Sequence, residues 1–300
     1  MFKWLPLIIL SYLFFALSSL GDKLVLKGPP KPLAYTFYTA LVGCSVIILL
    51  PFFSFTLPSQ DAIFFILIEP LLYLAALYFM FLSIEKFDIT RVALTMGSAQ
   101  PIFLFSLVWL WQGNQIINNK IIFALVLLLI GNILVSLKGK SQLLGKYLTP
   151  TLFASFLFSL DYIFIKIVFN KEGVLAGLFW IRLLAAFFAL SFLFSKKIKN
   201  EISSPKIFIN KKILSLIIFT FSMGGLANLL QAFAISLVPP LYLPILNALR
   251  GLHYFFLFLL VFLISKLFPH ILKEAFTKEE IIKKIGAIIF ISAGLFILTS

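Results

Sequence analysis

Four ionisable side chains lie in the middle of long apolar runs, where their types suit binding or proton chemistry. They are Glu69, Asp161, Arg182 and Arg250. A charged side chain at the centre of a bilayer costs roughly 2.5–3.5 kcal/mol on insertion scales, so such residues persist where they face protein or water. A carboxyl accepts hydrogen bonds or a proton, and a guanidinium presents a planar fork of donors suited to carboxylate or phosphate. The sequence therefore indicates a buried polar path with both signs of charge.

Proline accompanies two candidate positions in these runs. Pro70 follows Glu69, and Pro101 follows Gln100. Proline inside a helix leaves the carbonyl four residues earlier without its helical donor, so in a membrane that carbonyl must find another partner or line a cavity. Tyr73 lies four residues after Glu69 and so shares its helical face. Glu69 is interpreted either as a substrate or proton site or as a structural carboxyl paired with an arginine.

Polar side chains at helical spacing extend the candidate path. In the ninth apolar run the spacing i, i+3, i+4, i+7 predicts one polar stripe, for which the alternative is a buried ion pair of Arg250 with an acid. Small hydroxyls such as Thr95 alternatively mediate close helix packing. The proposed substrate-binding residues are Glu69, Tyr73, Thr95, Gln100, Asp161, Trp180, Arg182, Asn228, Gln231, Asn247, Arg250, His253 and Tyr254. Charged residues nearer the run ends are expected to reach toward the membrane interface: Asp22, Lys23, Lys166 and Arg91.

The composition places the chain in a membrane. Of its 300 residues 62% are hydrophobic and 12% charged, against roughly 45–50% and 25% in soluble proteins. The net charge of +14 does not indicate nucleic-acid binding, because the lysines lie between apolar runs, where cytoplasmic loops collect them. One cysteine and two histidines argue against a disulfide or a zinc site, so no metal and no cofactor are expected. No P-loop or hydrolase motif occurs, and an enzyme is not expected.

The apolar runs predict an all-α, polytopic membrane protein with ten transmembrane helices. A spanning helix needs about 20 mostly apolar residues. The segments that meet this need are 4–27, 33–53, 61–84, 89–111, 120–137, 148–169, 174–194, 212–236, 240–265 and 283–299. The expected location is the plasma (inner) membrane.

The two halves of the chain resemble each other. Ser19-Leu20-Gly21-Asp22 parallels Ser159-Leu160-Asp161, and Leu82-Ser83-Ile84 parallels Ala234-Ile235-Ser236. Because five is odd, the second copy must cross the membrane in the opposite direction, as in many transporters. The predicted organisation is two inverted five-helix repeats, with a first repeat over 1–138, a basic linker over 139–147 and a second repeat over 148–300.

Several short stretches, in their order and spacing, resemble a known family. They are Leu74-Ala75-Ala76-Leu77, Phe87-Asp88-Ile89-Thr90, Pro101, the arginine in Trp180-Ile181-Arg182, and Gly286 with Gly294. The chain resembles the EamA-type ten-helix members of the drug/metabolite transporter superfamily over nearly its whole length. The Leu-Gly-Glu that often follows the family's fourth span is replaced here by Gln112-Gly113-Asn114. The resemblance implies a carrier in which Arg182 matches the family's arginine.

These observations together favour a secondary transporter, an exporter or exchanger, of a small polar metabolite such as an amino acid or small carboxylate, working by alternating access. Its partners would be the small-molecule substrate and membrane lipids. Proton coupling through Glu69 or Asp161 and the formation of a homo-oligomer both stay open. One alternative is a lipid or polyprenyl-phosphate translocator whose basic loops hold headgroups. A second is a membrane-embedded enzyme, which is disfavoured because no catalytic set clusters near the interface.

The distribution of basic residues predicts the orientation. The odd-numbered connections hold nineteen of the 25 Lys and Arg residues, against three in the N-terminal segment and even-numbered connections. The positive-inside rule puts the odd connections in the cytoplasm and both termini outside, whereas the family resemblance implies cytoplasmic termini. Following the lysines, we expect a terminal reporter that works only in the cytoplasm to be silent; an active reporter would reverse the assignment.

Overall fold

The computed structural model describes residues 3–25, 31–86, 89–113, 119–136, 149–194, 199, 201 and 211–267, with isolated residues between 282 and 297. Among these residues every regular element is a helix. The helices are α1 (Trp4–Val25), α2 (Pro32–Val42), η1 (Gly43–Phe52), α3 (Gln60–Lys86), α4 (Ile89–Gln112), α5 (Asn119–Ser136), α6 (Thr149–Glu172), α7 (Val174–Leu190), η3 (Ser191–Phe194), α10 (Lys211–Leu237), η4 (Pro240–Tyr242), α11 (Leu243–Ala248) and α12 (Gly251–Leu267).

Seven helical segments of the described chain are long and apolar enough to cross a membrane. They are Trp4–Asp22, Pro32–Phe52, Gln60–Glu85, Thr149–Glu172, Val174–Phe194, Leu214–Leu237 and Pro240–Leu267. Large apolar side chains such as Phe64 and Leu110 are exposed on the outside of the bundle, as lipid requires. The chain is therefore an all-helical, multi-pass integral membrane protein. The predicted fourth and fifth segments are also helical, but the tenth lies largely outside the described residues, so ten spans remain a prediction.

The ninth predicted segment is not one continuous helix. A turn at Leu249 and Arg250 separates α11 from α12, and the Arg250 amide donates to the Asn247 carbonyl, three residues back (3.0 Å). The Tyr12 hydroxyl of α1 donates to the Leu246 carbonyl (2.8 Å), the group that the Arg250 amide would bond in a continuous α-helix. The prediction of a single helical stripe from Asn247 to Tyr254 is therefore wrong. Spacing within one segment cannot reveal a hydrogen bond supplied by another helix.

The second predicted segment also changes its winding. α2 ends at Val42, and the 3-10 helix η1 continues the span to Phe52. A 3-10 helix rises about 2.0 Å per residue, more than an α-helix, so it extends the span in fewer residues. η1 packs on α7, where a Cβ at Gly43 would lie 3.6 Å from the Arg182 carbonyl.

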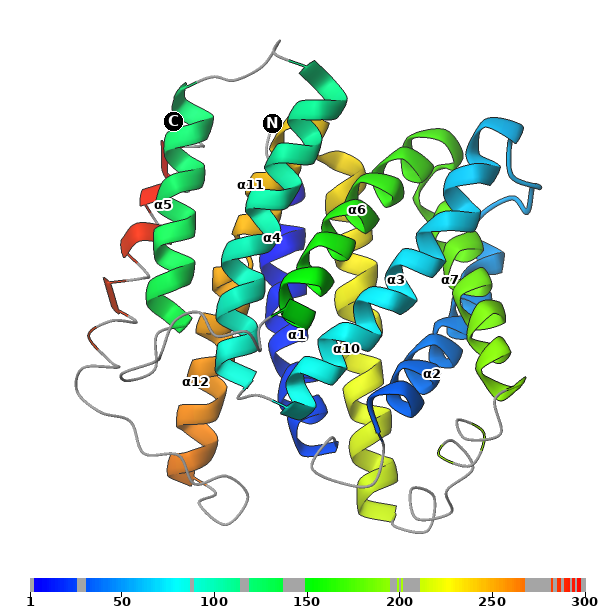
Figure 1. The fold of residues 1–300 in the computed structure, drawn as a ribbon, viewed down its shortest axis with the longest axis horizontal. Coiled ribbons are helices and arrows are strands. Elements are labelled where there is room, and N and C mark those ends of the chain that lie inside the picture. The colour runs from blue at the N-terminus through cyan, green and yellow to red at the C-terminus, as the bar shows by residue number, and fades with distance from the viewer. Residues whose placement is uncertain are drawn as a thin grey trace.

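The bundle is organised around two helix pairs. α1 packs most extensively on α10, and α3 packs most extensively on α6. α4 also packs on α6, and α12 packs on α1. Figure 1 shows α1, α4, α6 and α10 in the centre of the bundle, with α5 and α12 on its left side and α7 on its right side. The arrangement brings the middles of α3, α6 and α7 together.

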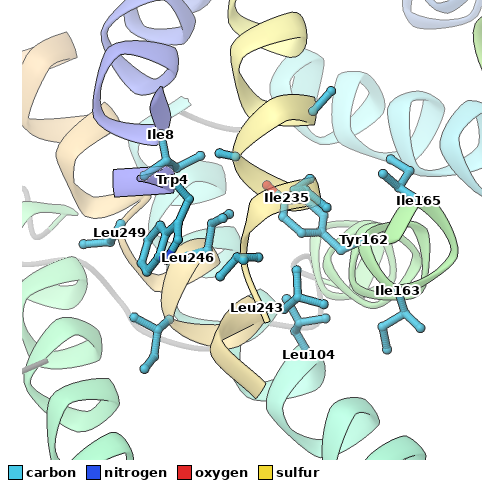
Figure 2. Packing of buried hydrophobic residues seen from close by; sticks show 14 of the residues in the cluster. Trp4, Ile8, Leu104, Tyr162, Ile163, Ile165, Ile235, Leu243, Leu246 and Leu249 are labelled. Carbon is cyan, nitrogen blue, oxygen red and sulfur yellow. The ribbon is translucent and has the colours of Figure 1, made fainter. Parts of the chain in front are cut away.

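A large apolar core fixes one part of this bundle. Its fully buried side chains include Trp4 and Ile8 of α1, Leu104 of α4, and Leu243 and Leu246 of α11. Figure 2 shows these side chains packing around Tyr162 and Ile235, which come from α6 and α10. Burying one such aliphatic or aromatic side chain contributes roughly 1.5–3 kcal/mol in water; within lipid, close packing replaces that driving force. The core therefore holds helices from both halves of the sequence against one another.

Small residues let α1 and α10 approach closely. The Ser11 hydroxyl donates to the Ala227 carbonyl (2.8 Å). A Cβ at Gly224 would lie 3.0 Å from the Ser18 hydroxyl oxygen, and a Cβ at Gly21 would lie 1.9 Å from the Thr220 hydroxyl oxygen. Close approach through small residues is how helices associate in lipid.

We predict that Gly21→Ala destabilises the protein and that Gly225→Ala does not. The added methyl group at Gly21 must displace Thr220, and overpacking typically costs about 1–3 kcal/mol. At Gly225 nothing lies within 4 Å of the new Cβ, so the better helix propensity of alanine leaves stability equal or slightly raised. Thermal unfolding of the purified variants in one detergent measures both. Equal melting temperatures for the two variants would contradict the close approach.

Candidate functional site

Two carboxyls and one guanidinium meet where α3, α6 and α7 pack together. Glu69 is 0% exposed, Asp161 3% and Arg182 9%. Arg182 interacts electrostatically with both carboxyls, and its Cζ lies 4.0 Å from the ring centroid of Tyr73, a cation–π contact. Glu69 and Tyr73 thus face the same guanidinium, as their four-residue spacing predicts. Four residues of the sequence-derived set, Glu69, Tyr73, Asp161 and Arg182, form the centre of the candidate site.

The two carboxyls lie side by side. Glu69 and Asp161 are within hydrogen-bonding reach of each other, yet neither Glu69 oxygen has a donor among the described groups. Two ionised carboxylates are both acceptors, so they can bond only when they share a proton. With one guanidinium nearby, the pair can therefore hold a proton or a cationic group.

Several buried polar atoms, including those of the two acids and Arg182, lack hydrogen-bond partners within the described chain. The atoms are both Glu69 oxygens, Asp161 Oδ1, Arg182 Nη1, Gln100 Nε2, Thr151 Oγ1, and Asn247 Nδ2 and Oδ1. Buried polar groups in folded proteins are nearly always hydrogen-bonded, because an unsatisfied one costs about 1–3 kcal/mol. Those of Glu69, Asp161 and Arg182, which lie together, are the donors and acceptors that a polar ligand could bond.

A second polar layer connects α4, α6 and the turn before α12. The Arg250 guanidinium donates to the side-chain oxygen of Gln100. The Ser159 hydroxyl is within hydrogen-bond distance of the Gln100 carbonyl (3.0 Å) and of the Ser155 carbonyl (2.8 Å). Arg250 also interacts electrostatically with Asp161. The predicted residues Gln100, Asp161 and Arg250 are therefore brought together, although the helix carrying Arg250 is interrupted.

A narrow cavity adjoins Arg182 between α6, α7 and α10. Its lining consists of Ile165, Phe169, Leu178, Arg182, Asn228, Gln231, Ala232 and Ile235, and its empty space is about 210 Å³. The Gln231 amide donates to the Tyr162 hydroxyl (2.7 Å), and the Asn228 amide donates to the Gly224 carbonyl (2.8 Å). About 10 Å³ of this space admits the centre of a water-sized molecule, roughly enough for one water, so the cavity is a narrow crevice with polar groups beside Arg182.

Two predicted residues lie away from the centre. The Trp180 indole donates to the Thr56 carbonyl (3.2 Å) and packs against Phe55 and Phe179 at the start of α7. His253 of α12 faces α1, with its Nε2 3.1 Å from the Ser19 hydroxyl oxygen. Trp180 therefore belongs to an aromatic cluster on a different face of α7 from Arg182, because residues two apart point about 200° apart around a helix. His253 is a hydrogen-bonded residue at the α1–α12 contact.

Thr95 of α4 and Tyr254 of α12 are the remaining predicted residues. Thr95 is half-buried in α4, and its carbonyl accepts a hydrogen bond from the Ser98 hydroxyl (3.3 Å). The Tyr254 side chain lies outside the described part of the chain. Neither residue is connected to the acid pair by a described contact, so their role stays a prediction.

Two charged residues expected at the interface are bonded within the protein. The Tyr35 hydroxyl of α2 donates to Asp22 of α1. Lys166 is 4% exposed and donates to the Ser236 carbonyl at the end of α10 (2.7 Å). Neighbouring helices therefore supply partners for both side chains, and whether they also reach the membrane interface stays a prediction.

The fold and the site define a class: a helical multi-pass membrane protein with a buried polar centre. No family model matches the chain, and no curated protein matches it. One solved structure, described only as "Crystal structure of protein", is similar with a TM-score of 0.67 and 12% sequence identity, covering 97% of this chain and 95% of that chain. At this identity the similarity shows the fold alone, and it extends over nearly the whole bundle.

We predict that Glu69→Gln leaves the protein as stable as the parent or more stable. The Glu69 oxygens have no donor to lose, whereas removing one partner of a structural buried ion pair costs about 3–5 kcal/mol. The matched control is Glu85→Gln, at an exposed position of the same helix. Thermal unfolding in detergent distinguishes a carboxyl without a structural partner from one in a structural ion pair. A melting temperature several degrees lower for Glu69→Gln alone would show that the Glu69 carboxyl is structural.

Proposed function

We propose that this chain is a secondary carrier that moves a small polar metabolite across a membrane by alternating access. The observation that carries the proposal is that Glu69, Asp161 and Arg182 are buried together and keep donor and acceptor atoms that have no hydrogen-bond partner among the described residues. Ionisable groups inside a membrane protein are expensive and mark substrate or ion paths. Their position inside the bundle, away from the apolar outer face, favours a small soluble substrate over a lipid headgroup.

The packing of the helices supports an inverted repeat. If each span of the first half is exchanged with its counterpart five spans later, the pair α1–α10 becomes α6–α3. The same exchange turns α4–α6 into the ninth span packed on α1, which corresponds to α12–α1. All four contacts are present. We therefore infer ten spans in two inverted repeats, and membership of the drug/metabolite transporter superfamily, with the site at the junction of the repeats.

The chemistry of the site supports a substrate that carries both donors and acceptors. An ammonium group would bond the acid pair, and a carboxylate would bond Arg182, whose Nη1 is free of partners within the described chain. An amino acid has both groups, and a small carboxylate has one. Because two carboxyls face one guanidinium, a proton on the pair would balance the charge, which supports proton coupling through Glu69 or Asp161.

We predict that site variants abolish transport by the purified chain in liposomes. Uptake of radiolabelled amino acids and small carboxylates is measured across an imposed pH gradient. Glu69→Gln and Arg182→Lys should each reduce the initial rate at least tenfold, since loss of one charged hydrogen bond is worth about 1.5–3 kcal/mol. Arg250→Ala should reduce it as well.

The control for this assay is Glu85→Gln, which changes the same residue type at an exposed position of α3 and should transport at the parental rate. Unchanged transport in Glu69→Gln and Arg250→Ala would remove the site assignment. Failure of the parent chain to transport any compound of either class would remove these two substrate classes.

A further inference from the structure

A polar pair, half-buried Asp22 and buried Tyr35, lies apart from the central charges. Asp22 is near the end of α1, and Tyr35 is near the start of α2. The Tyr35 side chain is 1% exposed, and its hydroxyl donates to Asp22. A carboxyl in a membrane helix requires an explanation, and the proposed substrate site does not use this one.

Aromatic rings surround the pair and connect it to two further helices. The Tyr35 ring centroid lies 4.8 Å from that of Phe81 in α3, at an interplanar angle of 64°, and 5.6 Å from that of Phe221 in α10, at 25°. Edge-to-face and offset-stacked ring pairs add attraction beyond the burial of their surface. One tyrosine thus joins α1, α2, α3 and α10.

This cluster forms an apolar layer on one side of the central charges. Val25, Tyr35, Leu77 and Phe81 are its buried members, and the partly buried residues packed against them are Tyr73, Met80, Ile84, Phe158, Leu216, Ile217 and Phe221. These residues lie toward the ends of α1 and α3 and the starts of α2 and α10, whereas Glu69 is in the first half of α3. The layer therefore separates the site from the membrane face where α1 ends.

The cavity lies on the other side of the same charges. Its apolar lining includes Phe169, in the last turn of α6, and Leu178, in the second turn of α7. α6 ends and α7 begins at the opposite end of the bundle from the end of α1 (Figure 1). The central site is thus covered by packed rings on one side and bordered by a narrow cavity on the other.

Tyr73 connects the two regions. It packs against the layer around Tyr35, and the face of its ring receives Arg182 at 4.0 Å. A change in the position of the guanidinium therefore acts directly on a member of the layer.

We propose that the Tyr35–Asp22 hydrogen bond latches a gate, the layer of aromatic and apolar residues that closes the central site from the membrane face where α1 ends. This inference rests on the proposed function as a carrier. Asp22 and Tyr35 are positioning residues, since they hold four helices together and do not touch the site. Opening requires Tyr35 to leave both Asp22 and the rings of Phe81 and Phe221.

The test measures access to the site without a substrate. Cys44 is the single cysteine, so Cys44→Ser gives a cysteine-free chain, to which Asn228→Cys in the cavity lining adds a reporter. A membrane-impermeant methanethiosulfonate reagent is applied to either face of oriented vesicles. We expect Tyr35→Phe and Asp22→Ala to raise the modification rate from the face where α1 ends about tenfold, the shift expected from losing a hydrogen bond to a charged group.

Tyr78→Phe is the matched control, because it removes a hydroxyl from half-buried Tyr78 of α3, outside the layer, and should leave the rate unchanged. If Asp22→Ala does not fold, Tyr35→Phe, which removes one oxygen atom, carries the test. A Tyr35→Phe rate equal to that of the parent would overturn the gate. Transport is measured separately. Transport by the parent chain with unchanged access in Tyr35→Phe would overturn the gate alone. Altered access in Tyr35→Phe without transport of any substrate by the parent chain would overturn the carrier function.

Discussion

The cost of keeping charge inside hydrocarbon is the constraint on which the bundle depends. Glu69, Asp161 and Arg182 are all buried, and the apolar exterior gives them no alternative partners. Three helices must therefore approach around them, and the attraction of one guanidinium for two carboxyls offsets only part of the desolvation. The excess carboxyl and the partnerless amides around it make the centre the least satisfied part of the described chain.

The two main helix crossings meet this constraint in different ways. At α1–α10, Gly21 lies directly against Thr220, and the contact is dry and close. At α3–α6, the acids Glu69 and Asp161 face each other. If the two proposed repeats are aligned so that Leu82-Ser83-Ile84 matches Ala234-Ile235-Ser236, Glu69 aligns with Phe221, the residue after Thr220. Corresponding crossings would thus be a tight contact in one copy and a polar one in the other.

Much of the helix pattern could be predicted from the sequence, because length and hydropathy decide which segments fill a membrane. The predicted segment 61–84 became α3 (Gln60–Lys86), and 148–169 became α6 (Thr149–Glu172). The cost of intramembrane charge also identified Glu69, Asp161 and Arg182, which the fold brings together. These predictions needed information from one segment at a time.

The features that spacing along the chain did not reveal have a common physical origin in contacts between segments. The interruption at Arg250 depends on Tyr12, 234 residues from Leu246 in the sequence. Lys166 stays inside because the end of α10 offers the Ser236 carbonyl. Trp180 has a polar ring nitrogen like a binding residue, yet the Thr56 carbonyl already accepts its hydrogen bond. In each case the partner comes from a distant segment, which spacing along the chain does not identify.

The interrupted ninth segment explains how a polar centre can exist beside a dry core. A continuous helix would bond the Leu246 carbonyl internally and carry Arg250 along a regular face. The turn instead gives that carbonyl to Tyr12 and lets the guanidinium reach Gln100, which precedes Pro101 in α4. Irregular backbone at membrane depth is tolerated where protein surrounds it, and here Leu246 and Asn247 are fully buried. The apolar core on one side of the turn thus stabilises the backbone irregularity, while the other side presents the charge to the site.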